Sequence, residues 1–345
     1  MNSRERVIKT LEFNNPDRIP VDLWVLPSAR AKYGDDFDRL LDKYERDIVQ
    51  FNGPLDLSFD PMAYQIGSYI DLWGCKWNNL QSGIVGEVKE PLFSDENTDK
   101  IDSYVAPLQA FKEMWSDYNP KLKNMIKTAR DDEKFVIGGW VSIFERMQFL
   151  RGTENLYCDL AEENDEFMII SEIVFSFYKS YLETWLKSDV DGIAFGDDWG
   201  SQRALLISPD LWKKYFRPKY KELFDMVKAA GKYVFFHSDG YIMDIYQDFI
   251  DMSVDAINSQ IWCMGVENVA ERFAGKITFW GEISRQNILP SGSPDDIRDA
   301  AEKMKKYLWV NGGGLIGQSE VGSDVPIDNI KAVLTSWRSV NSLLI

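Results

Sequence analysis

The sequence predicts an α/β fold, a (β/α)8 TIM barrel with an elaborated N-terminal segment, formed by residues 1–345 as a single domain. From residue 135 onward, short apolar runs alternate with long amphipathic stretches, which is the pattern of parallel strands joined by helices. Seven or eight such units in one chain favour a closed barrel over an open sheet. Residues 1–130 are less regular, with scattered Pro and Asn, and form the elaborated segment.

The predicted strands are apolar runs short enough to be buried in a sheet. They cover residues 19–25, 135–141, 192–198, 233–239, 256–260, 277–283 and 313–320. The stretches between them carry helix signals. Ser208 is an N-cap candidate, Pro209 follows it at the first helical position, and Gly231 is a stop signal. Pro218 should kink or split that helix, and Ser293 begins another helix that extends to residue 309.

The charge of the chain excludes several classes of partner. Its 39 Lys and Arg residues against 55 Asp and Glu residues give a net charge of −16, which argues against nucleic-acid binding and against anionic membranes. The 3 cysteines form no C-x-x-C pair and fit a reducing compartment. The N-terminus lacks an apolar signal segment and no run is long enough to span a membrane, so we expect a cytoplasmic protein.

Each predicted strand begins with apolar residues and ends with polar ones, at the edge where such barrels place their active sites. The residues at these ends are Trp140, Asp197, Asp198, His237, Asp239, Asn258, Gln260, Glu282 and Glu320. Any one of them could be an ordinary polar residue without a role in a site, because a strand end is also a boundary with solvent. Buried isolated carboxylates are costly, however, so the set as a whole favours a site that holds partners or a metal.

His237 is the only histidine and lies two positions before Asp239. Residues i and i+2 of a strand face the same side, so the two side chains can converge on one ion or one proton. An imidazole with carboxylates suits Zn²⁺, Mn²⁺ or Fe²⁺, and a hydrogen-bonded acid/base pair is the alternative. We predict a metal set of His237, Asp239 and Glu320, with Glu282 as a further ligand, because clustered carboxylates repel one another without a cation or a proton.

The remaining strand-end residues divide into two groups. We assign catalytic roles to Asp197, Asp198 and Glu282, and cofactor-binding roles to Asn258 and Gln260. Since neighbouring strand residues face opposite sides, one of Asp197 and Asp198 should orient the site or bind backbone. Several tryptophans could line an aromatic pocket, although core packing is the commoner role. These are Trp73, Trp77, Trp140, Trp199, Trp262 and Trp280.

Six segments together are typical of one protein family. They are SRERVIKTLEFNNPDRIPVDL (3–23), DLWGCKW (71–77), GIAFGDDWGSQ (192–202), LISPDLWKKYFRPKYKELFDMVKAAGKYVFFHSDG (206–240), ITFWGEISRQNILPSGSPDDI (277–297) and DVPIDNIKAV (324–333). In this combination the chain resembles the uroporphyrinogen decarboxylase superfamily, in particular its branch of cobamide-dependent methyltransferases. The resemblance covers nearly the whole chain and implies a (β/α)8 barrel with its site at the carboxyl ends of the strands.

Two departures from the family pattern bear on the substrate. The decarboxylases carry an Arg-rich segment after the first strand for the many carboxylates of their substrate, where this chain has only Arg30. Together with the net charge of −16, this shortage of arginines disfavours a porphyrinogen as the substrate. The zinc methyltransferases of the branch use a His-x-Cys motif and a later Cys as zinc ligands. Here His237 matches the histidine and Asp239 replaces the first Cys. Ser319-Glu320 lies near the position of the later Cys. Oxygen ligands would make zinc a stronger Lewis acid, suited to an ether oxygen.

The resemblance therefore implies a methyltransferase that moves a methyl group between a small methylated substrate and a corrinoid on a corrinoid-binding partner protein. A methoxyaromatic substrate and zinc are the specific expectations. Two alternatives stay open: a decarboxylase-like lyase that uses carboxylates without metal, and a non-catalytic accessory that docks a corrinoid protein. Barrels of this kind often dimerise, so a homodimer is also an expectation.

Overall fold

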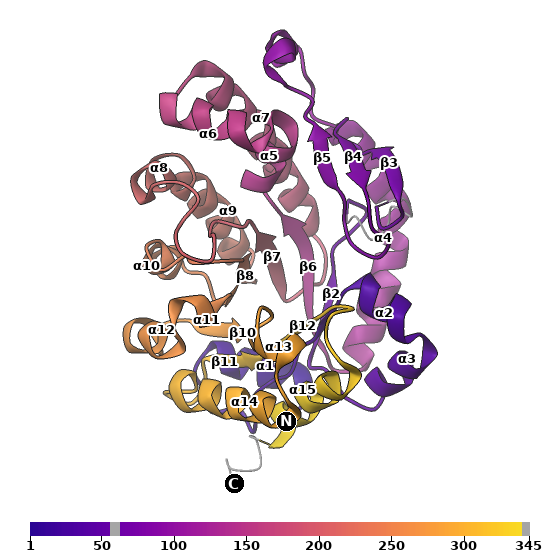
Figure 1. The fold of residues 1–345 in the computed structure, drawn as a ribbon, viewed down its shortest axis with the longest axis vertical. Coiled ribbons are helices and arrows are strands. Elements are labelled where there is room, and N and C mark those ends of the chain that lie inside the picture. The colour runs from indigo at the N-terminus through magenta and orange to yellow at the C-terminus, as the bar shows by residue number, and fades with distance from the viewer. Residues whose placement is uncertain (56–62, 340–345) are drawn as a thin grey trace.

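The structure, a computed structural model, describes residues 1–55 and 63–339. At its centre is a curled seven-stranded sheet whose neighbours are all parallel, in the order β2-β6-β7-β8-β9-β10-β11 (Figure 1). These strands are β2 (Ile48–Phe51), β6 (Phe135–Val141), β7 (Gly192–Gly196), β8 (Tyr233–Ser238), β9 (Ala256–Ser259), β10 (Thr278–Gly281) and β11 (Leu315–Gly317). A parallel pair extends one edge, β1 (Trp24–Val25) with β12 (Glu320–Val321).

The segment that contains β1 bridges the two edges of the curled sheet. On one side Gly317 N donates to Pro20 O (2.8 Å), which joins the segment to β11. On the other side Asp47 N donates to Val21 O (2.8 Å), and the Asp47 carboxylate accepts from Val21 N (2.7 Å). Asp47 directly precedes β2, so these bonds complete a barrel-like ring of strands. The predicted TIM-barrel class is confirmed.

The helices surround the sheet (Figure 1). They are α1 (Ser3–Leu11), α2 (Pro27–Tyr33), α3 (Asp35–Leu41), the 3-10 helix Asp95–Lys100, α4 (Leu108–Asp131), α5 (Phe144–Arg151), α6 (Thr153–Glu162), α7 (Asp165–Trp185), α8 (Pro209–Tyr215), α9 (Arg217–Ala229), α10 (Tyr246–Asp251), α11 (Ile261–Met264), α12 (Val266–Phe273), α13 (Ile288–Ser291), α14 (Pro294–Leu308) and α15 (Ile327–Ser339). Two predicted helix signals are confirmed. Ser293 forms a capping box with Asp296 at α14, and the predicted helix is split into α8 and α9 at Phe216, with Pro218 in the first turn of α9.

One end of the barrel is sealed by α1. Its Val7 and Leu11 belong to a buried cluster with Phe135, Phe235 and Trp280, whose side chains fill the barrel interior. A second, larger core lies between the sheet and the surrounding helices. Since α1 covers the bottom, the open end is the one where the strands finish, as the barrel rule requires.

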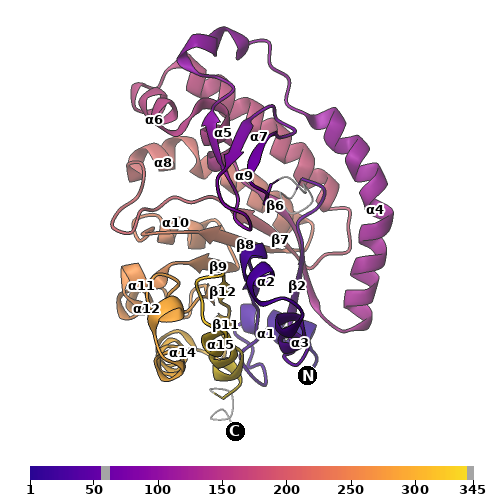
Figure 2. The same cartoon turned by 45° about the vertical axis from the view of Figure 1, so that its right-hand side comes forward.

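The N-terminal elaboration contains a small antiparallel sheet of β3 (Gly67–Ile70), β4 (Lys76–Asn79) and β5 (Glu87–Glu90). Figure 2 shows this sheet beside α5 and α7. Ring contacts fix it there, because Trp77 meets Phe149 of α5 (4.8 Å between ring centroids) and Trp73 meets Phe177 of α7 (4.5 Å). Within the described residues, every helix is too short or too polar to cross a membrane.

Candidate active site at the mouth of the barrel

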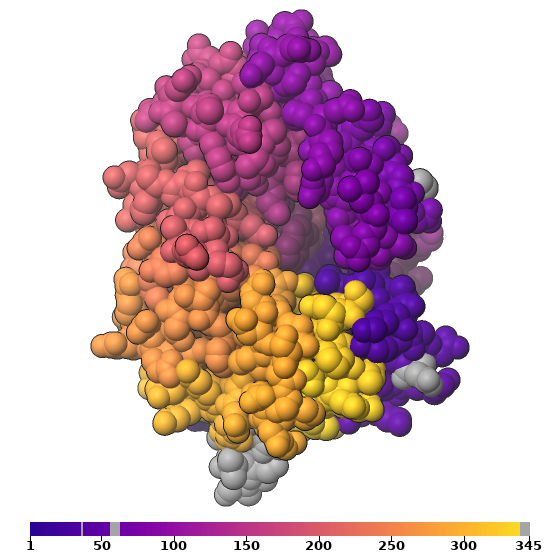
Figure 3. Space-filling view, in the orientation of Figure 1, coloured from indigo at the N-terminus to yellow at the C-terminus, as the bar shows by residue number. Residues whose placement is uncertain are grey.

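A large cavity of about 1320 Å³ opens where the strands end, and Figure 3 shows the hollow between the N-terminal elaboration and the C-terminal elements. Its wall includes Trp140 at the end of β6, His237 on β8 and Glu320 on β12. Aromatic rings make up much of the rest. They are Trp24, Tyr64, Trp73, Trp77, Phe149, Tyr178 and Tyr181.

Three of the predicted tryptophans therefore line the cavity, namely Trp73, Trp77 and Trp140. Trp199 and Trp280 are completely buried and belong to the core. Trp24, which the sequence pattern did not single out, packs against His237 with 5.4 Å between the ring centroids. The ring centroid of Trp140 lies 5.8 Å from that of the same imidazole.

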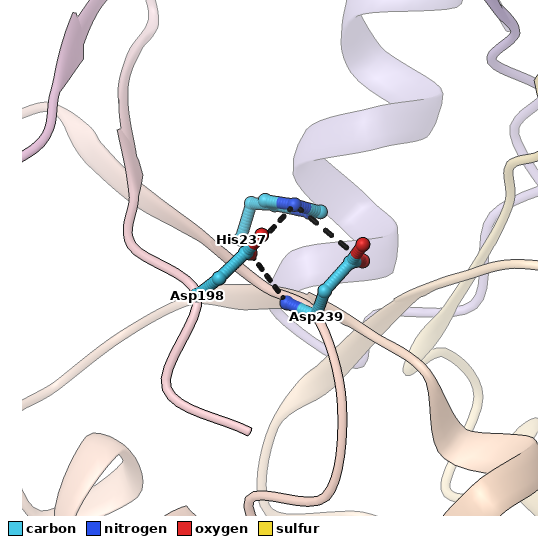
Figure 4. Close-up of side chains that lie close together, drawn as sticks. All are labelled: Asp198, His237 and Asp239. Atoms are coloured by element: carbon cyan, nitrogen blue, oxygen red, sulfur yellow. Dashed lines mark hydrogen bonds and ion pairs between the residues drawn. The ribbon is translucent and has the colours of Figure 1, made fainter. Parts of the chain in front are cut away.

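Asp198, His237 and Asp239 form the one group in the described chain with the spacing of metal ligands (Figure 4). One ligand atom from each lies within 4.8 Å of the others. His237 Nε2 is 3.5 Å from Asp198 Oδ1 and 3.7 Å from Asp239 Oδ1, while Asp239 N donates to Asp198 Oδ1 (2.8 Å). One imidazole and two carboxylates fit a catalytic divalent ion, which keeps a further position open for water or substrate.

The two carboxylates strongly affect the imidazole. Burial lowers the pKa of His237, but the hydrogen bond with Asp198 and the charges of Asp239 and Asp198 outweigh it and raise the pKa to about 10. Burial raises the pKa of Asp198, but the hydrogen bond and charge of His237, the bond from Asp239 N and the charge of Arg285 together lower it below its usual value. A bound cation would take the place of the proton between these three side chains.

Asn258 at the end of β9 holds the His237 ring in place. Its amide Nδ2 donates to Trp280 O (2.6 Å) and Gln318 Oε1 (3.0 Å), which leaves Oδ1 facing His237 Nδ1 at 2.6 Å. Nδ1 therefore carries the proton that is donated to Asn258, and Nε2 faces Asp198 and Asp239. This is the arrangement that orients metal-binding histidines in proteins.

Asn258 and Gln260, which the sequence predicts to bind a cofactor, both lie within the protein. Asn258 is completely buried behind His237, and Gln260 accepts a hydrogen bond from Gln202 Nε2. Neither is among the described residues of the cavity wall. The geometry gives Asn258 a positioning role instead.

Arg285, in the loop after β10, gives no signal in the sequence pattern but contacts three predicted site residues. Its guanidinium pairs with Asp239 and Glu320, and its Nε lies 3.1 Å from Glu282 Oε2. Glu282 and Glu320 are therefore held by Arg285 and lie outside the cluster of Asp198, His237 and Asp239. Burial raises the pKa of Glu282 to about 8, although the charge of Arg285 opposes this effect.

Asp197 turns away from its neighbour Asp198, as alternation along a strand requires. Its completely buried carboxylate accepts hydrogen bonds from Ile143 N (2.8 Å), Glu145 N (2.8 Å) and Tyr220 Oη. These bonds fix the start of α5, so Asp197 orients that helix rather than the reacting groups. Glu145 thereby reaches the cavity wall, where burial and the charge of Asp198 raise its pKa to about 8.

Residues 73–340 match the uroporphyrinogen decarboxylase (URO-D) family. The chain belongs to this family. Among solved structures it is similar to a methyltransferase from Methanosarcina mazei, with 14% identity, a TM-score of 0.72, and coverage of 98% of this chain and 99% of that chain. A chitinase from Chromobacterium violaceum gives a TM-score of 0.41 at 10% identity, over 93% of this chain and 99% of that one.

No curated protein matches the chain. The family predicted from the six sequence segments is confirmed, and the likeness to the methyltransferase establishes a shared fold over nearly the whole length of this URO-D protein.

Proposed function

We propose that this URO-D protein is a methyltransferase that moves a methyl group between a small methylated compound and a corrinoid carried by a partner protein. A divalent metal ion, zinc first, would be held by Asp198, His237 and Asp239. The observation that carries the proposal is the position of this cluster, because its imidazole lines a cavity with aromatic walls at the open end of the barrel. The methyltransferase fold of the neighbour supports it.

The size of the cavity supports a two-substrate reaction. Pockets for small ligands are about 300–1,000 Å³, and this cavity measures about 1320 Å³. The additional space allows a second bulky group, such as a corrinoid face, to approach a small methyl donor. Trp24 and Trp140 would flank the donor next to His237 and exclude water from it.

Different residues around the cavity would contribute different parts of the proposed reaction. When bound, the metal ion would polarise the leaving-group atom of the methyl donor as a Lewis acid. Asn258 keeps His237 Nε2 directed at the two aspartates. Arg285 pairs with Glu320, so that the charge of this carboxylate does not repel the reacting groups. Glu145 lines the cavity and, with a pKa of about 8, holds a proton at neutral pH that it can donate to the leaving group.

Free cob(I)alamin is a suitable probe for this reaction, since it needs no partner protein. We expect purified protein, mixed with a panel of methyl ethers and methylated amines, to form methylcobalamin with at least one donor, as followed by absorbance. Chelation should reduce the rate at least about tenfold, and added zinc should restore it. A rate equal to that without protein for every donor would contradict the proposal.

One observation favours a second candidate, a decarboxylase-like lyase. Glu145 and Glu282 both have a pKa raised to about 8, chiefly by burial, and protonated carboxyl groups can serve as acids in decarboxylation. Release of carbon dioxide from a carboxylate substrate, at a rate insensitive to chelation, would identify this activity. The single arginine, Arg30, in the segment that is Arg-rich in the decarboxylases argues against a porphyrinogen as that substrate.

Replacing Asn258 with alanine should weaken zinc binding about 10- to 100-fold, because the imidazole loses the acceptor that fixes its orientation. Titration of the metal-free protein with zinc, followed by calorimetry, measures this change. Gln260→Ala is the control, since Gln260 directly follows β9 and its side chain bonds Gln202 rather than His237, and this variant should bind zinc like the wild type. Equal affinities in all three proteins would show that Asn258 does not support a metal site.

A further inference from the structure

The loop after β10 places one guanidinium, that of Arg285, among three carboxylates beside the proposed metal cluster. Arg285 pairs with Asp239 and Glu320, and its Nε lies 3.1 Å from Glu282 Oε2. The four side chains are at most 27% exposed. Water therefore screens their charges only in part, and the attraction and repulsion among them are stronger than at an open surface.

The ratio of charges around Arg285 is the reverse of that in the ion pairs that hold the barrel together. The Asp47 carboxylate accepts hydrogen bonds from both Arg6 and Arg18, and Asp191 likewise pairs with two arginines. In those groups the positive side chains outnumber the carboxylate, whereas a single guanidinium faces three carboxylates around Arg285. Such an excess of negative charge lowers stability unless cations offset it, so it indicates a place that attracts cations.

Asp239 connects Arg285 with the metal cluster, because its two oxygens face different partners. Oδ2 pairs with Arg285, whereas Oδ1 lies 3.7 Å from His237 Nε2, on the side of Asp198 (Figure 4). A metal ion beside His237 would therefore receive one oxygen from Asp239. With Asp198 it would have three protein ligands and an open position, which suits zinc better than the larger oxygen shells of Mg²⁺ and Ca²⁺.

We propose that Arg285 determines the metal specificity of this site. It occupies the carboxylates that would otherwise hold a second divalent ion, and so restricts the site to one transition-metal ion. Without the guanidinium, Asp239, Glu282 and Glu320 would offer oxygen donors alone, which Mg²⁺, Ca²⁺ and Mn²⁺ prefer. The inference rests on the metal cluster of the proposed function and goes beyond it by assigning the selectivity of that cluster to a residue outside it.

The local backbone holds Arg285 in this position. Trp262 Nε1 donates to Glu282 O (2.8 Å), and Leu289 N of α13 donates to Ser284 O (2.9 Å), so the residues before Arg285 are fixed at two points. A guanidinium also stays protonated at every physiological pH. Arg285 is thus a fixed positive charge, which repels a second cation and keeps the carboxylate of Glu320 away from the first.

Metal titrations of the chelator-treated protein test the inference without any methyl transfer. Calorimetry gives the zinc affinity, and the electron paramagnetic resonance signal of free Mn²⁺ gives the affinity and number of bound Mn²⁺ ions. Zinc binds more tightly than Mn²⁺ to most protein sites, so the ratio of the two dissociation constants is compared between variants. We expect one ion per chain in the wild-type protein. Arg285→Leu should bind a second Mn²⁺ and lower the preference for zinc at least about tenfold.

Two further variants separate the charge of Arg285 from other effects of the substitution. Arg285→Lys keeps the positive charge without the planar fork, so it should bind one ion and retain the preference for zinc within about threefold. Arg217→Leu is the matched control, because Arg217 pairs with Asp248 (2.8 Å) and is absent from the described wall of the cavity. It should leave both affinities within about twofold.

Two Mn²⁺ ions per chain in the wild-type protein or in Arg285→Lys would overturn the inference, even if Arg285→Leu failed to fold. An unchanged stoichiometry and preference in Arg285→Leu, with the circular dichroism spectrum of the wild type, would overturn it while leaving the proposed function intact. A wild-type protein that binds no zinc would contradict both. The expected shift in preference, in a protein that methylates no cobalamin, would support the role of Arg285 and contradict the methyltransferase proposal.

Discussion

Replacing His237 with alanine is expected to lower zinc affinity by more than about 100-fold and to abolish methyl transfer to cob(I)alamin. His237 contributes the nitrogen donor of the cluster, and its Nε2 lies between Asp198 and Asp239. Without it, two carboxylates remain, partly neutralised by Arg285, and these bind a transition metal weakly. Metal content after purification without chelator, measured by inductively coupled plasma mass spectrometry, reports the first effect directly.

The control for this variant is Cys263→Ser. Cys263 is half-buried in the short helix α11, and a thiolate is a common zinc ligand in proteins. Its Sγ donates to Gln260 O (3.0 Å) and takes no part in the cluster of Asp198, His237 and Asp239. We expect this variant to retain the wild-type metal content. Less than about a tenth of an equivalent of any transition metal in the wild-type protein would contradict the proposed site itself.

The sequence pattern predicted the positions of the strand ends well, because buried apolar runs stop where solvent begins. The run 135–141 coincides with β6, and the run 233–239 contains β8, which ends at Ser238. This accuracy placed His237 and Asp239 on one side of a strand end, where the structure brings them together with Asp198. Spacing within a single strand was sufficient for that prediction.

Other elements gave no such signal. The strand β2 has only four residues and lies in the irregular first part of the chain, so periodicity could not reveal it. Arg285 and Arg146 form ion pairs with residues distant in sequence, Glu320 and Asp71 respectively, which the local pattern does not reveal. A long, flexible side chain reaches several elements, so its partners depend on how the barrel curls. Glu320, which the sequence predicts as a metal ligand, is paired with Arg285 in the structure.

The largest effect on stability is expected from Asp47→Ala, because Asp47 fastens the segment that closes the barrel. Its completely buried carboxylate accepts from Arg6 Nη1 (2.6 Å), Arg18 Nη1 (2.7 Å), Arg18 Nη2 (2.9 Å) and Val21 N (2.7 Å). Alanine would leave two guanidinium groups and a buried N–H without this acceptor. Breaking a buried ion pair of this kind lowers the free energy of unfolding by about 3–5 kcal/mol.

Urea denaturation, followed by tryptophan fluorescence, measures this loss as a shift of the unfolding midpoint. The control is Asp131→Ala on α4, since Asp131 forms an exposed pair with Lys127 (2.9 Å) and its removal should change stability by less than about 1 kcal/mol. If Asp47→Ala behaved like Asp131→Ala, the bond between Val21 and Asp47 would be dispensable. The segment that contains β1 would then be held sufficiently by the backbone bond from residue 47 N to Val21 O, by its bonds to Gly317 of β11 and by the pairing of β1 with β12.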